Sequence, residues 1–577
     1  MTTSQQGKAL DRKKFFQDPF LIVAIFFLII FFTLFIVYPL VILLKDGFAS
    51  STQGFTFTSF QYVFSSYSGF IKAMENSIII GLAVSAGAVI VGLLFAYVDV
   101  YVKLRTKVLK LLFNIVSFLP VVSPPFVISI SLILLFGDTG FITHDLFHII
   151  NAQHAFYGFP GIISVEIVTF FPVAYLMLKG LLKNIDPSLE EAARDMGASR
   201  WKVFTTVTLP LMLPGIGNAF LVTFVESVAD FANPMIIGGS METMATSIYN
   251  QLMGSNGADA QYQAAAMSCV LLLISMSVFI VQKYCLERKT VSTLTGKASR
   301  QRMLITDKSV TIPLSIICGL ISLFVISLYV LVIMCSFWKN LVNYNFTWKH
   351  YQVIFSDNGM SAFGPTLTMS GIAAPLTAIM SMVIAYLIVK KKFKGKGAIE
   401  FVSMLAMAVP GTILGVGFIR GYVQGIFHTG ILKSLYNTMW IIIIVFIVRS
   451  LPVGVRSGVS ALRQIDKSIE ESAYDLGGNS LHVFNTVTLP LISDSFFSSL
   501  VTAFVRSITA ISAVIMLVTP NLQLVTCQIN EYAGKGDYCT ATAYATILII
   551  IASVAVGIMN IAMKFIGKGT KLNTEEN

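Results

Sequence analysis

Among the ionisable residues inside long apolar stretches of this chain, Glu166, Glu226, Asp230 and Arg506 stand out. A charged side chain at membrane depth is costly and usually marks a path for an ion or solute. The segment FVES, which contains Glu226, returns 280 residues later as FVRS, which contains Arg506. If two halves of the chain face each other, these two residues are predicted to form an ion pair or a two-sided polar lining. A purely structural pair of buried charges is the alternative.

Other polar residues extend this candidate path. The sequence DFANP, from Asp230 to Pro234, predicts a break near the outer end of a span, and broken helices often line solute sites; a simple turn is the alternative. Glu166 either lines the path or forms a hydrogen bond with a neighbouring helix. The predicted path residues are Glu166, Glu226, Asp230, Asn233, Arg506 and Ser507.

The sequence gives little support for a catalytic site or a metal site. His144 and His148 have the i, i+4 spacing of a weak metal signal, but solvated loop residues are the expected interpretation, and no metal site is predicted. No nucleophile–base pair stands out, so no catalytic residue is predicted.

Cys527 and Cys539 lie in the last outer loop, where an oxidising compartment would permit a disulfide between them. None of the Gly-Lys pairs is followed by Ser or Thr, as a P-loop requires.

The composition indicates an integral membrane protein. Of 577 residues, 55% are hydrophobic and 12% are charged, and the mean hydropathy is +0.78. Soluble domains carry about 25% charged residues. The net charge of +11 fits cationic residues held on the cytoplasmic side of a membrane, so no nucleic-acid partner is expected.

Twelve apolar segments are long enough to cross a membrane as helices. We expect them at 20–44, 76–98, 109–136, 160–182, 212–236, 264–284, 311–336, 364–389, 399–420, 437–458, 493–518 and 541–564. With the N-terminus inside, 32 of the 40 Lys and Arg residues fall in cytoplasmic segments and six in outer ones. This bias predicts that both termini are cytoplasmic. Prolines in the third and ninth spans, including Pro124 and Pro410, predict kinks.

The chain is a tandem repeat. Residues 190–211 and 470–491 are identical at 13 of 22 positions, and each copy follows the fourth span of its half. Both halves begin inside with the same number of spans, so the repeat is parallel, with its axis along the membrane normal. We expect one half at 1–290 with its loop at 186–211, a basic cytoplasmic linker at 291–310, and a second half at 311–577 with its loop at 466–491.

Each repeated loop predicts a helix–turn–helix on the cytoplasmic face. Asp186 is a favourable N-cap, Pro187 suits the first helical position, and Gly197 can end the helix in a left-handed conformation. A second short helix should run from Ser199 to about residue 207, after which Thr208-Leu209-Pro210 turns the chain back to the membrane. Interfacial amphipathic helices that merely complete the fold are the alternative. Since loop sequences usually drift, the close match instead suggests that both copies meet the same partner surface.

The repeated pattern, E-E-A/S-A-x-D-x-G followed by T-L-P, resembles the EAA loop of ABC importer permeases, the membrane components of binding-protein-dependent transport systems. The resemblance implies the all-α type I permease fold, with about twelve transmembrane helices in two six-helix repeats. It also implies that each loop is a coupling helix that docks into an ATPase subunit. The coupling residues carried over are Glu190, Glu191, Ala193, Asp195, Gly197, Glu470, Glu471, Ala473, Asp475 and Gly477. Ser472 departs from the strict E-A-A.

The fused halves most resemble the ferric-iron permease branch. The resemblance implies a non-catalytic inner-membrane subunit, two copies of an ATPase that hold ATP and Mg²⁺, and an extracytoplasmic solute-binding protein. No cofactor is expected in this chain, and membrane lipid surrounds it. Aminophosphonate, thiamine, polyamine or sugar phosphate are alternative solutes. An ion-coupled secondary transporter would not explain two matching loops, and a membrane-embedded enzyme would need clustered catalytic residues.

Overall fold

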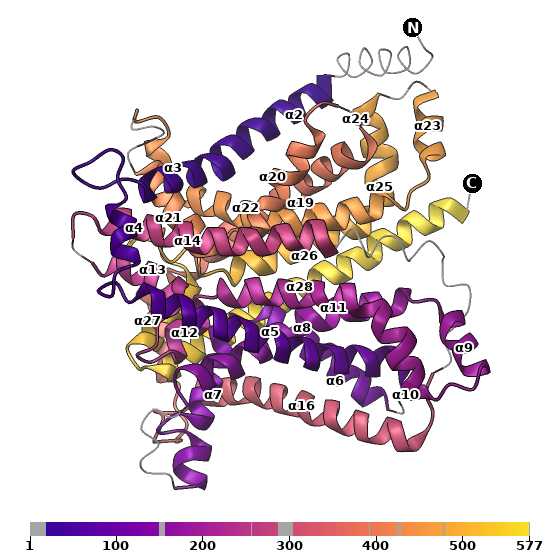
Figure 1. Ribbon diagram of the computed structural model, residues 1–577, viewed down its shortest axis with the longest axis horizontal. Helices are drawn as coiled ribbons and strands as arrows, with labels where there is room; N and C mark the ends of the chain where they lie inside the picture. Colours follow the sequence, from indigo (N-terminus) through magenta and orange to yellow (C-terminus); the bar gives the residue numbers. More distant parts are fainter. Residues whose placement is uncertain are drawn as a thin grey trace. The chain divides into compact units, whose positions relative to one another are not determined.

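The computed structural model is helical throughout the residues that it describes (Figure 1). Isolated bridges are the only β-type pairings among them. The described residues are 19–104, 106–148, 156–255, 257–286, 304–391, 393–423, 425, 429–475, 477 and 479–575. Most of the predicted linker and the extreme termini lie outside this set.

The predicted spans correspond to helices. Among the described residues, ten helices are long and apolar enough to cross a membrane, and two further pairs of bent helices raise the number to as many as twelve. The bent pairs are Lys396–Ala408 with Gly411–Tyr422, at 109°, and Leu481–Leu491 with Ser493–Ile508, at 79°. The expected kink at Pro410 is therefore a sharp break. The third predicted span is also divided, because Ser123, Pro124 and Pro125 separate α6 (Lys107–Val122) from α7 (Phe126–Phe136).

The chain divides into two compact units. The N-unit comprises residues 47–359 and 528–549. Its centre is a set of three packed helices, α5 (Phe70–Tyr101), α8 (Phe159–Asn184) and α11 (Leu209–Val228). Around them lie α4 (Thr58–Val63), α6, α7, α9 (Pro187–Asp195), α10 (Arg200–Val203), α12 (Ala232–Ile237), α13 (Met244–Met253), α14 (Ala260–Val281), α16 (Lys308–Cys335) and α17 (Lys349–Phe355).

The C-unit comprises residues 1–46, 360–527 and 550–577. Its centre repeats the same arrangement, with α19 (Phe363–Lys390), α22 (Met439–Leu462) and α26 (Ser493–Ile508) side by side (Figure 1). Its other elements are α2 (Pro19–Phe32), α3 (Tyr38–Gly47), α20 (Lys396–Ala408), α21 (Gly411–Tyr422), α23 (Lys467–Asp475), α24 (Ser480–Val483) and α25 (Leu489–Leu491). The helices α27 (Val525–Gly534) and α28 (Tyr538–Glu575) contribute residues to both units.

The two sequence repeats exchange their first helices. The N-unit is built from the first repeat but includes α16, which begins the second and packs against α5, α6 and α7. The C-unit correspondingly includes α2 and α3 from the start of the chain. The predicted boundaries at residues 290 and 311 describe the sequence repeat and stay a prediction.

Glycine allows the central helices to approach closely in both units. A Cβ at Gly92 of α5 would come within 2.8 Å of the Tyr175 backbone nitrogen on α8. A Cβ at Gly454 of α22 would come within 2.3 Å of the hydroxyls of Ser381 and Ser499, on α19 and α26. Small residues at such crossings let membrane helices pack backbone to backbone.

Candidate functional site

The first repeated loop forms the expected helix and turn. The Asp186 carboxylate accepts a hydrogen bond from the Ser188 backbone N–H at 3.0 Å and caps α9. This bond and one from the Ser188 side chain lower the pKa of Asp186 below its usual value of 3.8. Gly197 follows the helix with φ of +85°, which confirms the predicted left-handed position.

The second part of the loop differs from expectation. Thr208-Leu209-Pro210 does not turn the chain back, because α10, a π-helical turn at Phe204–Thr208 and α11 form one continuous helix over Arg200–Val228. Pro210 lies inside this continuous helix and has no backbone N–H, and the π-helical turn just before it accommodates the missing hydrogen bond. The span therefore begins inside the loop.

Glu190 points into the N-unit. Its side chain is only 4% exposed, and its Oε1 accepts hydrogen bonds from the Tyr101 hydroxyl at 2.5 Å and the Thr208 hydroxyl at 2.8 Å. Glu190 thus fastens α9 to the end of α5 and to the π-helical turn. A role for Glu190 in coupling would act through the position of the loop, since its carboxylate is not on the surface.

Three large apolar side chains on the outside of this loop were not singled out from the sequence. Leu189, Met196 and Trp201 are 50%, 83% and 73% exposed. Among the predicted coupling residues, Asp195 and Gly197 are exposed, Glu191 is half-buried and Ala193 is buried. The loop therefore exposes three large apolar side chains, while Glu190, one of the acids that the two copies share, is buried.

The second loop repeats this surface. Ile469 and Leu481 are the equivalents of Leu189 and Trp201 at the repeat offset, and they are 45% and 42% exposed. Gly477 has φ of +88°, matching Gly197. Asp475 is exposed and Ala473 half-buried, whereas the side chains of Glu470 and Glu471 lie outside the described residues.

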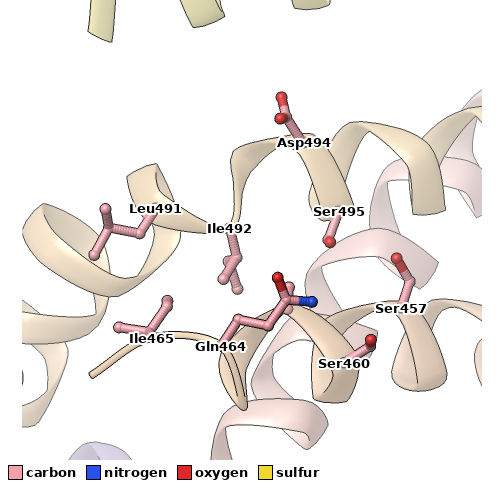
Figure 2. Close-up of a pocket in the computed structure, with 9 residues that line it drawn as sticks. Ser457, Ser460, Gln464, Ile465, Leu491, Ile492, Asp494 and Ser495 are labelled. Carbon is pink, nitrogen blue, oxygen red and sulfur yellow. The ribbon is translucent and has the colours of Figure 1, made fainter. Parts of the chain in front are cut away.

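The two loops differ where they rejoin the membrane helices. In the second copy the helix breaks at Ile492, so that α25 and α26 are bent by 79°. A cavity of about 450 Å³ lies at this break, with Gln464 and Ile465 just before the loop and Leu491 and Ile492 just after it. Figure 2 shows the Gln464 side chain extending toward Ser495, while Asp494 points away. Both ends of the second loop thus border one polar cavity.

Two of the predicted path residues in the N-unit, Glu166 and Asp230, accept hydrogen bonds from neighbouring side chains. Glu166 is fully buried on α8, and its Oε2 accepts a hydrogen bond from the Ser227 hydroxyl on α11. The hydrogen-bonding alternative for Glu166 is therefore the arrangement observed.

The predicted break after Asp230 is present, because α11 ends at Val228 and α12 begins at Ala232. Asp230 Oδ2 accepts a hydrogen bond from the amide of Asn233 at 2.7 Å, and Asn233 Oδ1 accepts one from Ser129 at 2.7 Å. Asn233 is buried. These bonds hold the break to α7, so the turn has a structural role; whether it lines a path stays a prediction.

The corresponding region of the C-unit is cationic. Arg506 is exposed on α26, and its Nη1 lies 3.5 Å from the carbonyl oxygen of Arg449, whereas Ser507 is buried and donates to the carbonyl oxygen of Ala503. Arg449 lies within α22 and donates a hydrogen bond to the Ser512 hydroxyl at 3.0 Å. Glu226 and Arg506 belong to different units, and their pairing stays a prediction.

A further ion pair was not predicted from the sequence. Arg420 Nε, on α21, lies 2.5 Å from Asp46 Oδ2, at the end of α3, and both side chains are largely buried, at 15% and 10% exposed. The chain separation of 374 residues hides this pair from any local pattern. It joins the first span of the chain to α21, the second helix of the bent pair in the second repeat.

Cys527 and Cys539 are both buried and no disulfide joins them in the structure, and the bond between them stays a prediction. Cys527 is the last residue of the C-unit stretch 360–527, whereas Cys539 belongs to the N-unit. The Sγ atom of Cys539 lies 3.6 Å from that of Cys335. The sequence prediction paired Cys539 with Cys527 because both lie in one loop. In the structure, the cysteine in contact with Cys539 is Cys335, at the end of α16.

Comparisons with known proteins agree with this architecture. The family of binding-protein-dependent transport system inner membrane components matches twice, at residues 88–292 and 377–571. The ferric transport system permease protein FbpB of Actinobacillus pleuropneumoniae is 35% identical over 542 residues, covering 92% of this chain and 77% of that protein. A putative ferric transport system permease, FbpB 1 of Haemophilus influenzae, is 34% identical over 516 residues, covering 88% and 79%.

A more distant relative covers one repeat. The molybdenum transport system permease ModB of Escherichia coli K12 is 31% identical over 208 residues, which is 35% of this chain and 90% of that protein. The paired matches and the paired three-helix centres have one explanation. This chain belongs to the binding-protein-dependent transport system inner membrane components, the multi-pass permeases of ABC importers, with two copies of the family fused in one chain.

Proposed function

We propose that this permease imports ferric iron, driven by ATP hydrolysis on two ATPase subunits that dock on the two repeated loops. ATP-driven approach of the ATPase subunits would move the loops and open the path alternately to each side, with both chain termini in the cytoplasm. An extracytoplasmic binding protein would deliver the solute. The ATP and Mg²⁺ sites would belong to the ATPase subunits, as implied by the lack of a P-loop sequence in this chain.

The matched apolar surface of the loops is the observation that carries the docking proposal. Leu189 and Trp201 in one loop, and Ile469 and Leu481 in the other, are all at least 42% exposed. Exposed apolar patches bordered by polar residues mark interaction sites. Because the same positions are apolar in both copies, two identical partners would find the same surface. Apolar faces lying on lipid are the alternative.

Co-purification with the ATPase encoded beside the permease gene separates these alternatives. The double variant Leu189→Asp/Ile469→Asp should lose the ATPase, since a carboxylate would be buried in each contact. The control Ser188→Asp/Ser468→Asp adds the same charges one residue away, in the first helical turn where acids are favourable. Retention of the ATPase by the Leu189/Ile469 variant would contradict docking through these side chains.

The substrate proposal is supported by two relatives, both ferric transport permeases by name and matching most of this chain. Cells that produce the complete system should accumulate radiolabelled ferric iron, and excess molybdate or spermidine should leave this uptake unchanged. Uptake that is lost with excess molybdate or spermidine would instead favour another solute.

The orientation is tested separately by reporter fusions, which should place both ends of the chain in the cytoplasm.

A further inference from the structure

Two cysteines from distant parts of the sequence meet at the ends of two helices. Cys335 is the last residue of α16, and Cys539 is the second residue of α28. Their Sγ atoms are 3.6 Å apart, both are free, and their side chains are 0% and 2% exposed. A disulfide requires about 2.05 Å between the sulfurs. At 3.6 Å the two sulfurs are already in van der Waals contact.

Hydrogen bonds on either side of the pair hold the two helix ends together. Asp537 accepts hydrogen bonds from the Thr540 N–H at 3.1 Å and hydroxyl at 2.7 Å, which caps α28. His350 on α17 bridges this cap to the end of α16, with its Nδ1 2.8 Å from the Thr540 hydroxyl and its Nε2 2.8 Å from the Trp338 carbonyl oxygen. The sulfur contact is therefore part of a fixed junction.

The side of the membrane suits thiol oxidation. The α16 helix starts at Lys308, after the basic linker, and Cys335 lies at its opposite end. The charge distribution assigns the linker to the cytoplasm and so assigns the Cys335 end to the outer side. Disulfides form and persist in extracytoplasmic compartments.

We propose that Cys335 and Cys539 form a reversible disulfide that ties the first turn of α28 to the end of α16. In the reaction one thiolate attacks the disulfide of a thioredoxin-type oxidant, and the second thiolate then displaces that oxidant. Both cysteines lose their protons, the S–S bond forms, and the two electrons reduce the oxidant's disulfide to a dithiol. Because both sulfurs are buried, the exchange requires the first turn of α28 to separate from α16.

The bond would fix one end of a helix that belongs to both units. Residues 538–549 of α28 are part of the N-unit, and its later residues are part of the C-unit. A disulfide at Cys539 anchors the N-unit end covalently, whereas the reduced pair leaves it held by hydrogen bonds and packing. Oxidation is therefore expected to slow any step in which this end moves.

The test uses the full-length permease with a protease site inserted between residues 424 and 432, which separates the two cysteines into different fragments. After treatment with the oxidant diamide, which accepts two electrons and two protons, cleaved wild type should stay full-length on a non-reducing gel. It should separate into two fragments after reduction. Peptide mass analysis should find a link between Cys335 and Cys539.

Serine variants identify the partners. Cys527→Ser should remain linked, while Cys335→Ser and Cys539→Ser should separate; Cys335→Ala and Cys539→Ala repeat the test with apolar replacements, and gel filtration checks that each is folded. Separation of Cys527→Ser would overturn the proposal in favour of a bond to Cys527. Complete separation of oxidised wild type, in which all six cysteines are present, would also overturn it.

Discussion

The carboxylate of Glu190 accepts a hydrogen bond from the hydroxyl of Tyr101, which lies 89 residues earlier at the end of α5. This bond joins the first helix of the repeated loop to one of the three central helices of the N-unit. A movement of the loop is therefore transmitted directly to α5. Glu190, one of the acids that the two copies share, thus holds the loop in place, and the neighbouring Leu189 is exposed.

Replacing Glu190 by Ala should loosen the first loop. The hydroxyls of Tyr101 and Thr208 would each lose a buried partner, which costs about 1–3 kcal/mol. Amide hydrogen exchange over residues 187–208 should become faster, and the unfolding temperature should fall. Asp195→Ala removes an exposed carboxylate from the same helix and should leave both measurements unchanged. Equal effects of the two substitutions would contradict the inward role of Glu190.

Alanine at Gly197 or Gly477 should destabilise its loop by about 1–2 kcal/mol, because a left-handed backbone strains any residue with a Cβ. A Cβ at either glycine meets no neighbouring atom, so the cost is conformational only. Gly180→Ala is the matched control, since it lies inside α8 with equally open surroundings and should stabilise the protein slightly. Thermal unfolding in detergent measures all three. Unchanged stability of the Gly197 variant would contradict the assigned conformation.

The Asp186 cap should make the stability of the first loop depend on pH in the acid range. Its pKa is lowered in the folded protein by bonds from Ser188, so its contribution is complete above 3.8 and is lost as the pH falls through the lower folded value. Asn at this position still caps the helix but does not titrate. The protection of α9 amides from hydrogen exchange, corrected for the intrinsic rate at each pH, should therefore fall more steeply below pH 5 in wild type than in Asp186→Asn. Parallel profiles would exclude this contribution.

The Asp46–Arg420 pair should appear as a coupled site in stability measurements. Removing one partner leaves a charge in a largely buried place, and Asp46→Asn or Arg420→Met should each cost roughly 3 kcal/mol. The double variant should cost less than the sum of the two, because neither charge is then left alone. Chemical unfolding of the three variants gives the coupling energy. Additive costs would mean that the two side chains do not interact.

The sequence was sufficient to predict the helices and the loops, because apolar length, capping residues and a left-handed glycine are local signals. Pro210 misled the prediction, since a π-helical turn lets the helix run through it. The prediction failed there because the sequence pattern does not show where an α-helix changes locally to π-helical hydrogen bonding.

The contacts that organise the candidate site depend on long separations. Tyr101 with Glu190, Asp46 with Arg420 and Cys335 with Cys539 are 89, 374 and 204 residues apart. The exposed apolar pair Leu189 and Ile469 was within reach of sequence analysis, because the two repeats align there. Leu189 and Ile469 are similar but not identical, so a comparison of identical positions in the two repeats does not include them.

Transport by the reconstituted complex tests the central claim most directly. Proteoliposomes that contain the permease, its ATPase and its binding protein should accumulate radiolabelled ferric iron only when ATP is supplied. The Leu189→Asp/Ile469→Asp variant should lose this uptake, and Ser188→Asp/Ser468→Asp should keep it. Uptake that continues in the Leu189/Ile469 variant, or that an ion gradient drives without the ATPase, would contradict an importer coupled through its two matched loops.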